Sequence, residues 1–170
     1  MSEKKVTSLV WFRNNLRVID NLSLKKSIEN SDKVIGYVNI DPNINSTTIY
    51  GFKKTEKYRI KFLLESISDL KKQLKKINVS LVVKNEDLKS SINSVIRKYE
   101  IDNIYIQKEW TRDELIEEEC IPSHINLIKD FDQFLFSPSD VSEIYENIPR
   151  GFSNFRKKCE KYLSIDDIIP

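Results

Sequence analysis

Two short polar segments carry the side chains best suited to binding a ligand. The first, Arg13-Asn-Asn-Leu-Arg-Val-Ile-Asp-Asn21, follows an apolar run, and the second, Lys108-Glu-Trp-Thr-Arg112, follows another. Guanidinium and indole groups stack on planar rings, and a carboxylate accepts hydrogen bonds from ring N–H groups. Together the segments therefore suit a planar, polar, aromatic ligand. The side chains they offer are Arg13, Asn14, Asn15, Arg17, Lys108, Glu109, Trp110 and Arg112.

Structural roles for these residues remain open from the sequence alone. Arg13 and Arg17 can pair with Asp20 or Glu109 and simply close the loop that contains them. Asp20-Asn21 directly precedes an expected helix, where either side chain can serve as the N-cap.

Strand and helix patterns alternate along the chain as far as about residue 131. Apolar runs bounded by turn residues predict five strands, and three- and four-residue apolar spacing predicts the helices between them. The longest helix is expected over Thr55–Lys76, with Thr55 as its N-cap and an apolar stripe from Ile60 to Leu74. The expected strands are Val6–Phe12, Lys33–Ile40, Val79–Val83, Asn103–Gln107 and Ile125–Phe131, and the other helices are Asn21–Glu29, Asp87–Tyr99 and Arg112–Cys120.

The alternation stops near residue 131. We therefore expect an α/β domain over residues 1–131 and a C-terminal extension over 132–170. Within the extension, Gln133–Asn147 lacks clear periodicity and is expected to be irregular, whereas Gly151–Leu163 is expected to form an amphipathic helix. If the apolar face of this helix is exposed, it predicts self-association. That face comprises Phe152, Phe155, Cys159, Tyr162 and Leu163.

Composition excludes several classes of function. The 170 residues are 32% charged and 39% hydrophobic, which is typical of a soluble globular protein. No apolar run is long enough for a membrane span, and the first strand leaves no room for a signal peptide, so a cytoplasmic location is expected. The single His124 and two isolated cysteines argue against a zinc site or a Ser-His-Asp triad, and we assign no catalytic or metal-binding residue.

Charge and glycine content further limit the kinds of ligand that the chain is expected to bind. The net charge of +2 is too small to indicate nucleic-acid binding by itself. The three glycines cannot form either G-x-G-x-x-G or a P-loop. The run Glu117-Glu-Glu119 is expected to be a solvated helix face. A basic patch at the start of the longest helix fits either ordinary solubility or a phosphate-bearing partner such as a DNA backbone; it comprises Lys53, Lys54, Lys57, Arg59 and Lys61.

The first polar segment resembles the opening motif of the photolyase/cryptochrome family, W-F-R-x-D-L-R-x-x-D-N. The matching residues are Trp11, Phe12, Arg13, Leu16, Arg17, Asp20 and Asn21. Asn15 stands where the family usually has Asp, which removes a carboxylate that can hold a neighbouring arginine. Residues 51–70, 104–114 and 148–160 resemble further family segments, the last of them most familiar from the DASH cryptochromes.

Pattern and resemblance together favour one fold. We expect a five-stranded parallel, Rossmann-like sheet of order 3-2-1-4-5, as in the N-terminal domain of photolyases, with helices on both faces. In that order the winding reverses between the first and fourth strands, and open α/β sheets bind ligands at the carboxyl ends beside such a switch point. The two polar segments should meet there.

The resemblance also implies a function. In the family, an antenna pigment in or beside the α/β domain passes light energy to reduced FAD, which then donates an electron to a pyrimidine dimer. The flavin lies in a larger helical domain, to which no segment of this chain corresponds. The resemblance therefore implies an antenna domain that cannot repair DNA alone. It would act with a flavin-binding helical domain, in the same gene product or as a split partner, and reach DNA only indirectly.

The resemblance points to particular pigment-binding residues. DASH-like members usually use methenyltetrahydrofolate, and Glu109 matches the acidic position that hydrogen-bonds the pterin, with Gln107, Lys108 and Trp110 as neighbours. A deazaflavin antenna would instead lie nearer Arg13 and the loop around Asp41. The full candidate set is Arg13, Asn14, Arg17, Asp41, Gln107, Lys108, Glu109 and Trp110.

Two other functions remain open. One is an adenine-nucleotide-binding module related to stress proteins and electron-transfer flavoproteins. The other is a protein-interaction domain without a small ligand, docking through Gly151–Leu163.

Overall fold

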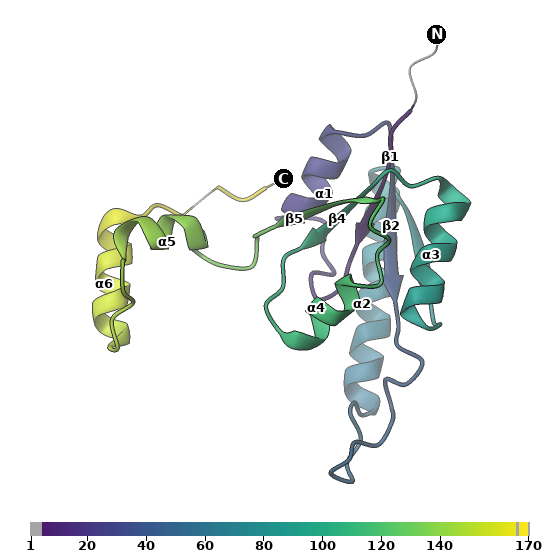
Figure 1. The fold of residues 1–170 in the computed structure, drawn as a ribbon, viewed down its shortest axis with the longest axis horizontal. Coiled ribbons are helices and arrows are strands. Elements are labelled where there is room, and N and C mark those ends of the chain that lie inside the picture. The colour runs from purple at the N-terminus through teal and green to yellow at the C-terminus, as the bar shows by residue number, and fades with distance from the viewer. Residues whose placement is uncertain (1–4, 166, 170) are drawn as a thin grey trace.

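A five-stranded parallel sheet forms the centre of the computed structural model, which describes residues 5–165 and 167–169 (Figure 1). Its order is β3-β2-β1-β4-β5, as the sequence predicts, and every neighbouring pair is parallel. The strands lie close to their predicted limits, because strands of a covered sheet stand out as apolar runs between turn residues. They are β1 Thr7–Trp11, β2 Lys33–Asn39, β3 Ser80–Lys84, β4 Asn103–Gln107 and β5 Asn126–Asp130.

Separate apolar cores cover the two faces of the sheet, which confirms the prediction of helices on both sides. Successive strand residues point to opposite faces, so Leu9 and Trp11 of β1 enter one core whereas Val10 and Phe12 enter the other. Helix α3 (Leu88–Tyr99) covers the first core. Helices α1 (Leu22–Glu29) and α2 (Lys57–Lys76) cover the second. The middle strand β1 is thereby held rigidly, and the loop after it starts from a fixed point.

Helix α2 begins later than predicted. Thr55 is not its N-cap; Glu56 takes that position, without a side-chain capping bond to any described residue, and the helix starts at Lys57. The predicted apolar stripe is buried at Ile67, Leu70 and Leu74. Further toward the N-terminus, the helix extends past the sheet, as Figure 1 shows. Leu63 still packs against the core, whereas its neighbour Leu64 is 51% exposed.

Asn21 is the N-cap of α1, in agreement with the sequence. Its Oδ1 accepts a hydrogen bond from the Leu24 backbone N–H at 3.0 Å, and its Nδ2 donates to the Arg17 carbonyl at 2.9 Å. The preceding Asp20 has a φ of +56°, a left-handed conformation that Asp tolerates better than most residues. The backbone of Asp20 also donates to the Ile169 carbonyl at 2.8 Å, which brings the end of the described chain back to the loop after β1.

The C-terminal extension contains two helices and not one. The prediction of an irregular segment over Gln133–Asn147 is wrong, because α5 spans Pro138–Ile144 with Ser137 as its N-cap. It packs beside α6 (Phe152–Tyr162), and the pair lies to one side of the sheet in Figure 1. The rings of Tyr145 and Phe155 stack with centroids 5.6 Å apart.

Packing of α5 on α6 covers part of the face expected to drive self-association. Cys159 is fully buried, whereas Phe152 is 72% and Tyr162 is 57% exposed. Homo-oligomerisation through this helix stays a prediction. The predicted domain boundary after residue 131 directly follows β5, and a separate role for residues 132–170 is likewise a prediction. Among the described helices, none has the length and apolar content needed to cross a membrane.

Candidate functional site

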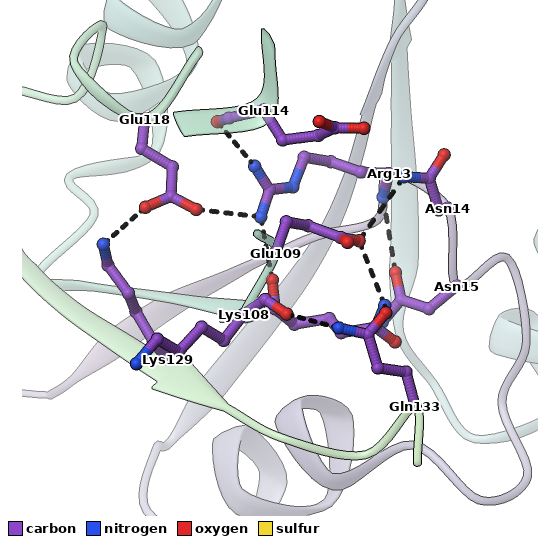
Figure 2. A network of polar contacts seen from close by, with 10 residues as sticks. Arg13, Asn14, Asn15, Lys108, Glu109, Glu114, Glu118, Lys129 and Gln133 are labelled. Atoms are coloured by element: carbon purple, nitrogen blue, oxygen red, sulfur yellow. Dashed lines mark hydrogen bonds and ion pairs between the residues drawn. The ribbon is translucent and has the colours of Figure 1, made fainter. Parts of the chain in front are cut away.

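The carboxyl ends of β1 and β4 are adjacent, so the two polar segments meet as predicted. At their centre Glu109 is a nearly buried carboxylate, 7% exposed. Its Oε1 accepts hydrogen bonds from Gln107 Nε2 at 3.0 Å and from Asn14 Nδ2 at 3.4 Å. Figure 2 shows Gln133 completing this arrangement, since its Nε2 donates to the Lys108 carbonyl at 2.8 Å. Both described bonds to Glu109 use Oε1 and not Oε2.

Trp110, the residue after Glu109, belongs to a cluster of aromatic rings. Trp110 is 50% exposed, and its ring centroid lies 5.1 Å from that of Phe131 and 5.9 Å from that of Phe134. Lys108 Nζ sits 4.5 Å from the Phe131 centroid and 5.5 Å from the Trp110 centroid. A half-exposed indole with a cation nearby can stack on a planar ring, and an oriented carboxylate can bind the polar edge of one.

Arg13 has a structural role in the same region. Its side chain is 6% exposed, and its Nη2 donates to the Gln107 carbonyl at 2.8 Å and to Glu118 Oε1 at 3.1 Å. Its Nη1 donates to the Glu114 carbonyl at 3.1 Å (Figure 2). These bonds fasten the end of β1 to β4 and to α4 (Arg112–Glu118). The guanidinium thus holds the protein backbone and a carboxylate in place, and presents little surface to a ligand.

The expectation that Glu117-Glu-Glu119 forms a solvated face is wrong for its middle member. Glu118 is 8% exposed and pairs with both Arg13 and Lys129, because α4 turns this side chain toward the sheet. Glu119 is exposed, as expected. Glu117 is half-buried, and its removal from water raises the pKa of its carboxyl above the ordinary value.

Asn15, the departure from the family motif, is 5% exposed. Its Oδ1 accepts a hydrogen bond from the Arg13 backbone N–H at 3.3 Å. Its Nδ2 is buried without a hydrogen-bond partner among the residues that the structure describes. A buried donor of this kind is costly unless something accepts from it.

Two candidate residues lie apart from Glu109. Arg17 donates from Nε to the Asp20 carbonyl at 2.8 Å and from Nη2 to the Asp132 carbonyl at 3.0 Å, so it closes the loop against the segment after β5. Asp41 is exposed in the loop after β2, where it pairs with Lys54 at 3.8 Å. The structure therefore groups Asn14, Gln107, Lys108, Glu109 and Trp110. Arg13 holds the backbone of this group in place through its hydrogen bond to the Gln107 carbonyl.

Sequence reasoning missed the contribution of the loop after β5. Phe131, Gln133 and Phe134 all contact the Glu109–Trp110 region. Since β5 is the neighbour of β4, its carboxyl end opens at the same edge of the sheet. The predicted strand order already contained that signal, but Gln133 and Phe134 were placed in the C-terminal extension, and Phe131 was expected only as the last residue of a strand.

Comparisons with known proteins agree with this fold. A family model described as DNA photolyase matches residues 8–169. The chain is 31% identical over 175 residues to cryptochrome DASH of Gloeobacter violaceus, a match that covers 100% of the chain and 35% of that protein. It is 28% identical to a chloroplastic/mitochondrial cryptochrome DASH of Oryza sativa subsp. japonica, and this match covers 93% of the chain and 31% of that protein.

Solved structures give the same result. A cryptochrome structure from Synechocystis superposes with a TM-score of 0.85 at 27% identity, covering 99% of this chain and 36% of that one. An archaeal photolyase from Sulfolobus tokodaii, solved with two FAD molecules, shares the fold with a TM-score of 0.78 at 21% identity, covering 96% and 36%. The chain thus spans about a third of the length of the relatives it matches.

Proposed function

This chain belongs to the DNA photolyase family, and we propose that it binds a light-harvesting pterin of the methenyltetrahydrofolate type at Glu109. The observation that carries this proposal is the buried, oriented carboxylate of Glu109, which is followed in the chain by the half-exposed indole of Trp110. When bound, such a pigment absorbs near-ultraviolet light and passes the excitation energy onward.

The residues present fit a pterin. Glu109 Oε2 can accept from the amide and amino N–H groups on one edge of the ring, while Gln107 and Asn14 fix the carboxylate in place. Trp110 can stack on the ring face, and Lys108 supplies a nearby positive charge. The Asn15 amide donor, which is buried without a partner among the described residues, adds a group that a bound water can satisfy.

The same geometry favours the pterin over a deazaflavin. A deazaflavin was expected near Arg13 and Asp41, but the Arg13 guanidinium already binds two backbone carbonyls and Glu118. Asp41 already pairs with Lys54. A deazaflavin that used Arg13 and Asp41 would replace contacts that these side chains already make, whereas a pterin at Glu109 leaves them intact.

The chain would act together with a FAD-binding part. Because the chain spans about a third of its relatives' length, the full light-driven reaction requires a further helical part that holds FAD and contacts damaged DNA. That part would belong to the same gene product or to a split partner. That helical part, and not the residues described above, would decide whether the whole protein repairs DNA or signals.

The test is a titration of the purified chain with methenyltetrahydrofolate, followed by gel filtration and near-ultraviolet absorption. We expect a pigment band that elutes with the protein. Glu109→Gln should weaken binding about tenfold or more, since hydrogen bonds to a charged group contribute roughly 1.5–3 kcal/mol. The matched control is Glu119→Gln, an exposed glutamate at the end of α4.

Equal pigment retention by Glu109→Gln and the unchanged chain would overturn the site assignment. Retention of a deazaflavin in preference to the pterin would overturn the choice of pigment. Urea unfolding of both variants separates loss of the site from loss of the fold.

A further inference from the structure

Two carboxylates fasten the segment that follows β5 to helix α1. Asp130 Oδ1 pairs with Lys26 Nζ, and Asp132 Oδ2 accepts a hydrogen bond from the Leu22 backbone N–H at 3.0 Å. Leu22 is the first residue of α1, and Lys26 lies about one turn further along the helix. The two carboxylates are therefore spaced to bind successive turns of the same helix.

The residues between and after these carboxylates face the other way, as alternate side chains do along a strand. The Phe131 ring contacts the Trp110 ring, with centroids 5.1 Å apart. Gln133 binds the end of β4 with both ends of its amide. Its Oε1 accepts from Gln107 Nε2 at 3.2 Å, and its Nε2 donates to the Lys108 carbonyl at 2.8 Å (Figure 2). One short segment thus connects α1 with the end of β4.

Hydrogen bonds continue from this segment to Glu109. The Gln107 Nε2 atom donates both to Gln133 Oε1 at 3.2 Å and to Glu109 Oε1 at 3.0 Å. Gln107 is 5% exposed, so solvent has little access to its amide. A buried amide that loses one acceptor must leave a donor unsatisfied or turn toward another group. A shift of Gln133 would therefore reach the Glu109 carboxylate through Gln107.

Asp132 occupies a position that is costly for a carboxylate. It is partly buried, and its Oδ1 has no hydrogen-bond partner among the described residues. Removal from water raises the pKa of its carboxyl above the ordinary value. What the carboxylate gains is the Leu22 N–H at the positive end of α1. The Asp132 carbonyl also accepts from Arg17 Nη2 at 3.0 Å, so this residue joins the loops after β1 and β5.

We propose that Asp132 is a positioning residue for the pterin site, and that it keeps Phe131 and Gln133 against the end of β4 by binding the start of α1. This inference rests on the proposed function, since it concerns pigment binding at Glu109. The carboxylate acts through Gln133 and needs no contact with the pterin. Without the bond to α1, the segment is free to shift, and the carboxylate of Glu109 is less well oriented.

The first measurement is an absorption titration of the full chain and its variants with methenyltetrahydrofolate. Asp132→Ala should weaken binding roughly fivefold, a change of the size that one hydrogen bond contributes. The absorption maximum of the bound pigment should also shift, because the ring edge then meets a differently oriented carboxylate. Asp132→Asn should restore the spectrum and bring the affinity to within about twofold of the unchanged chain, since its amide oxygen can accept the same N–H.

The matched control is Asp87→Ala. Asp87 also binds the start of a helix, because its Oδ2 accepts from the Ser90 backbone N–H in α3 at 3.0 Å. Helix α3 covers the other face of the sheet. Asp87→Ala should lower stability to urea much as Asp132→Ala does, but leave the pigment's affinity and spectrum unchanged. Equal weakening of pigment binding by the two variants would reduce the role of Asp132 to general stability and overturn the proposal.

A double-mutant cycle tests the route through Gln133. Gln133→Ala removes the bonds to Gln107 and Lys108 directly. If Asp132 acts through Gln133, the double variant should bind the pterin more tightly than the product of the two single effects predicts. A double variant that shows the full product would mean that the two residues act separately, which would contradict the proposal.

Amide hydrogen exchange of the pigment-free chain separates this inference from the proposed function. Residues 131–136 should exchange faster in Asp132→Ala than in the unchanged chain, and no faster in Asp87→Ala. If the unchanged chain binds no pterin, the proposed function is wrong, and faster exchange would still support the hold of Asp132 on this segment. If the pterin binds and Asp132→Ala changes neither its affinity nor the exchange, the positioning role is wrong and the proposed function stands.

Discussion

The Glu109 region and the surface of residues 49–64, in the loop after β2 and the first turns of α2, both combine polar and aromatic side chains. They differ in whether these side chains are buried or exposed. We call the second region the 49–64 surface. Around Glu109 the polar groups are buried and bind one another, so Arg13, Gln107 and Glu118 all have partners inside the protein. On the 49–64 surface the cations and rings face solvent, and the ion pairs of Lys54 with Asp41 and of Lys61 with Glu65 are exposed. The first region is therefore fixed by contacts formed on folding, whereas the second is left exposed by the fold.

This difference predicts where substitutions damage the fold. Arg13→Met should have the largest effect and lower the free energy of unfolding by about 3–5 kcal/mol, because it leaves the buried Glu118 carboxylate with only Lys129. Arg59→Met, on the exposed surface, should change it by less than about 0.5 kcal/mol. Urea unfolding followed by circular dichroism measures both.

Adding Glu118→Gln to Arg13→Met removes the stranded charge and should recover part of the lost stability. A loss below about 1 kcal/mol for Arg13→Met would contradict a role for this ion pair in holding β1, β4 and α4 together.

A medium effect is expected at the start of α1, and almost none at the start of α2. Asn21→Ala removes the capping bond to Leu24 and should cost about 0.5–2 kcal/mol. Glu56→Ala at the start of α2 should be nearly neutral, since Glu56 makes no side-chain capping bond with any described residue. Thermal and urea unfolding of the two variants give the comparison directly. Similar losses in both would show that Glu56 contributes a contact that the structure does not reveal.

The smallest effect should be a pH dependence from Glu117. Burial raises the pKa of this carboxyl in the folded state, so the folded protein binds this proton more tightly than the unfolded chain does. The contribution to stability is present at low pH and is lost as the pH rises through the raised pKa. Glu117→Gln should thus be more stable relative to the unchanged chain at pH 7 than at pH 4. Glu119→Gln changes an exposed neighbour, so its stability relative to the unchanged chain should be the same at pH 7 and pH 4.

The fold was largely predictable, because strand and helix periodicities are local signals. The strand order and the meeting of the two polar segments follow from them together with the family motif. The pairing of Arg13 with Glu118 was not predictable, because these residues are 105 positions apart and a run of three glutamates suggests only solvation. Helix α5 was missed although Ser137-Pro138 is a typical helix start, with a capping hydroxyl followed by proline at the first helical position.

The two tryptophans of the chain lie in contrasting surroundings. Trp11 is 2% exposed within the core, and Trp110 is 50% exposed beside Glu109. An aqueous quencher such as iodide or acrylamide will therefore reach one emitter far more readily than the other. The protein carries its own pair of optical reporters, one for the integrity of the sheet and one for events at its edge, and no external label is needed to follow them separately.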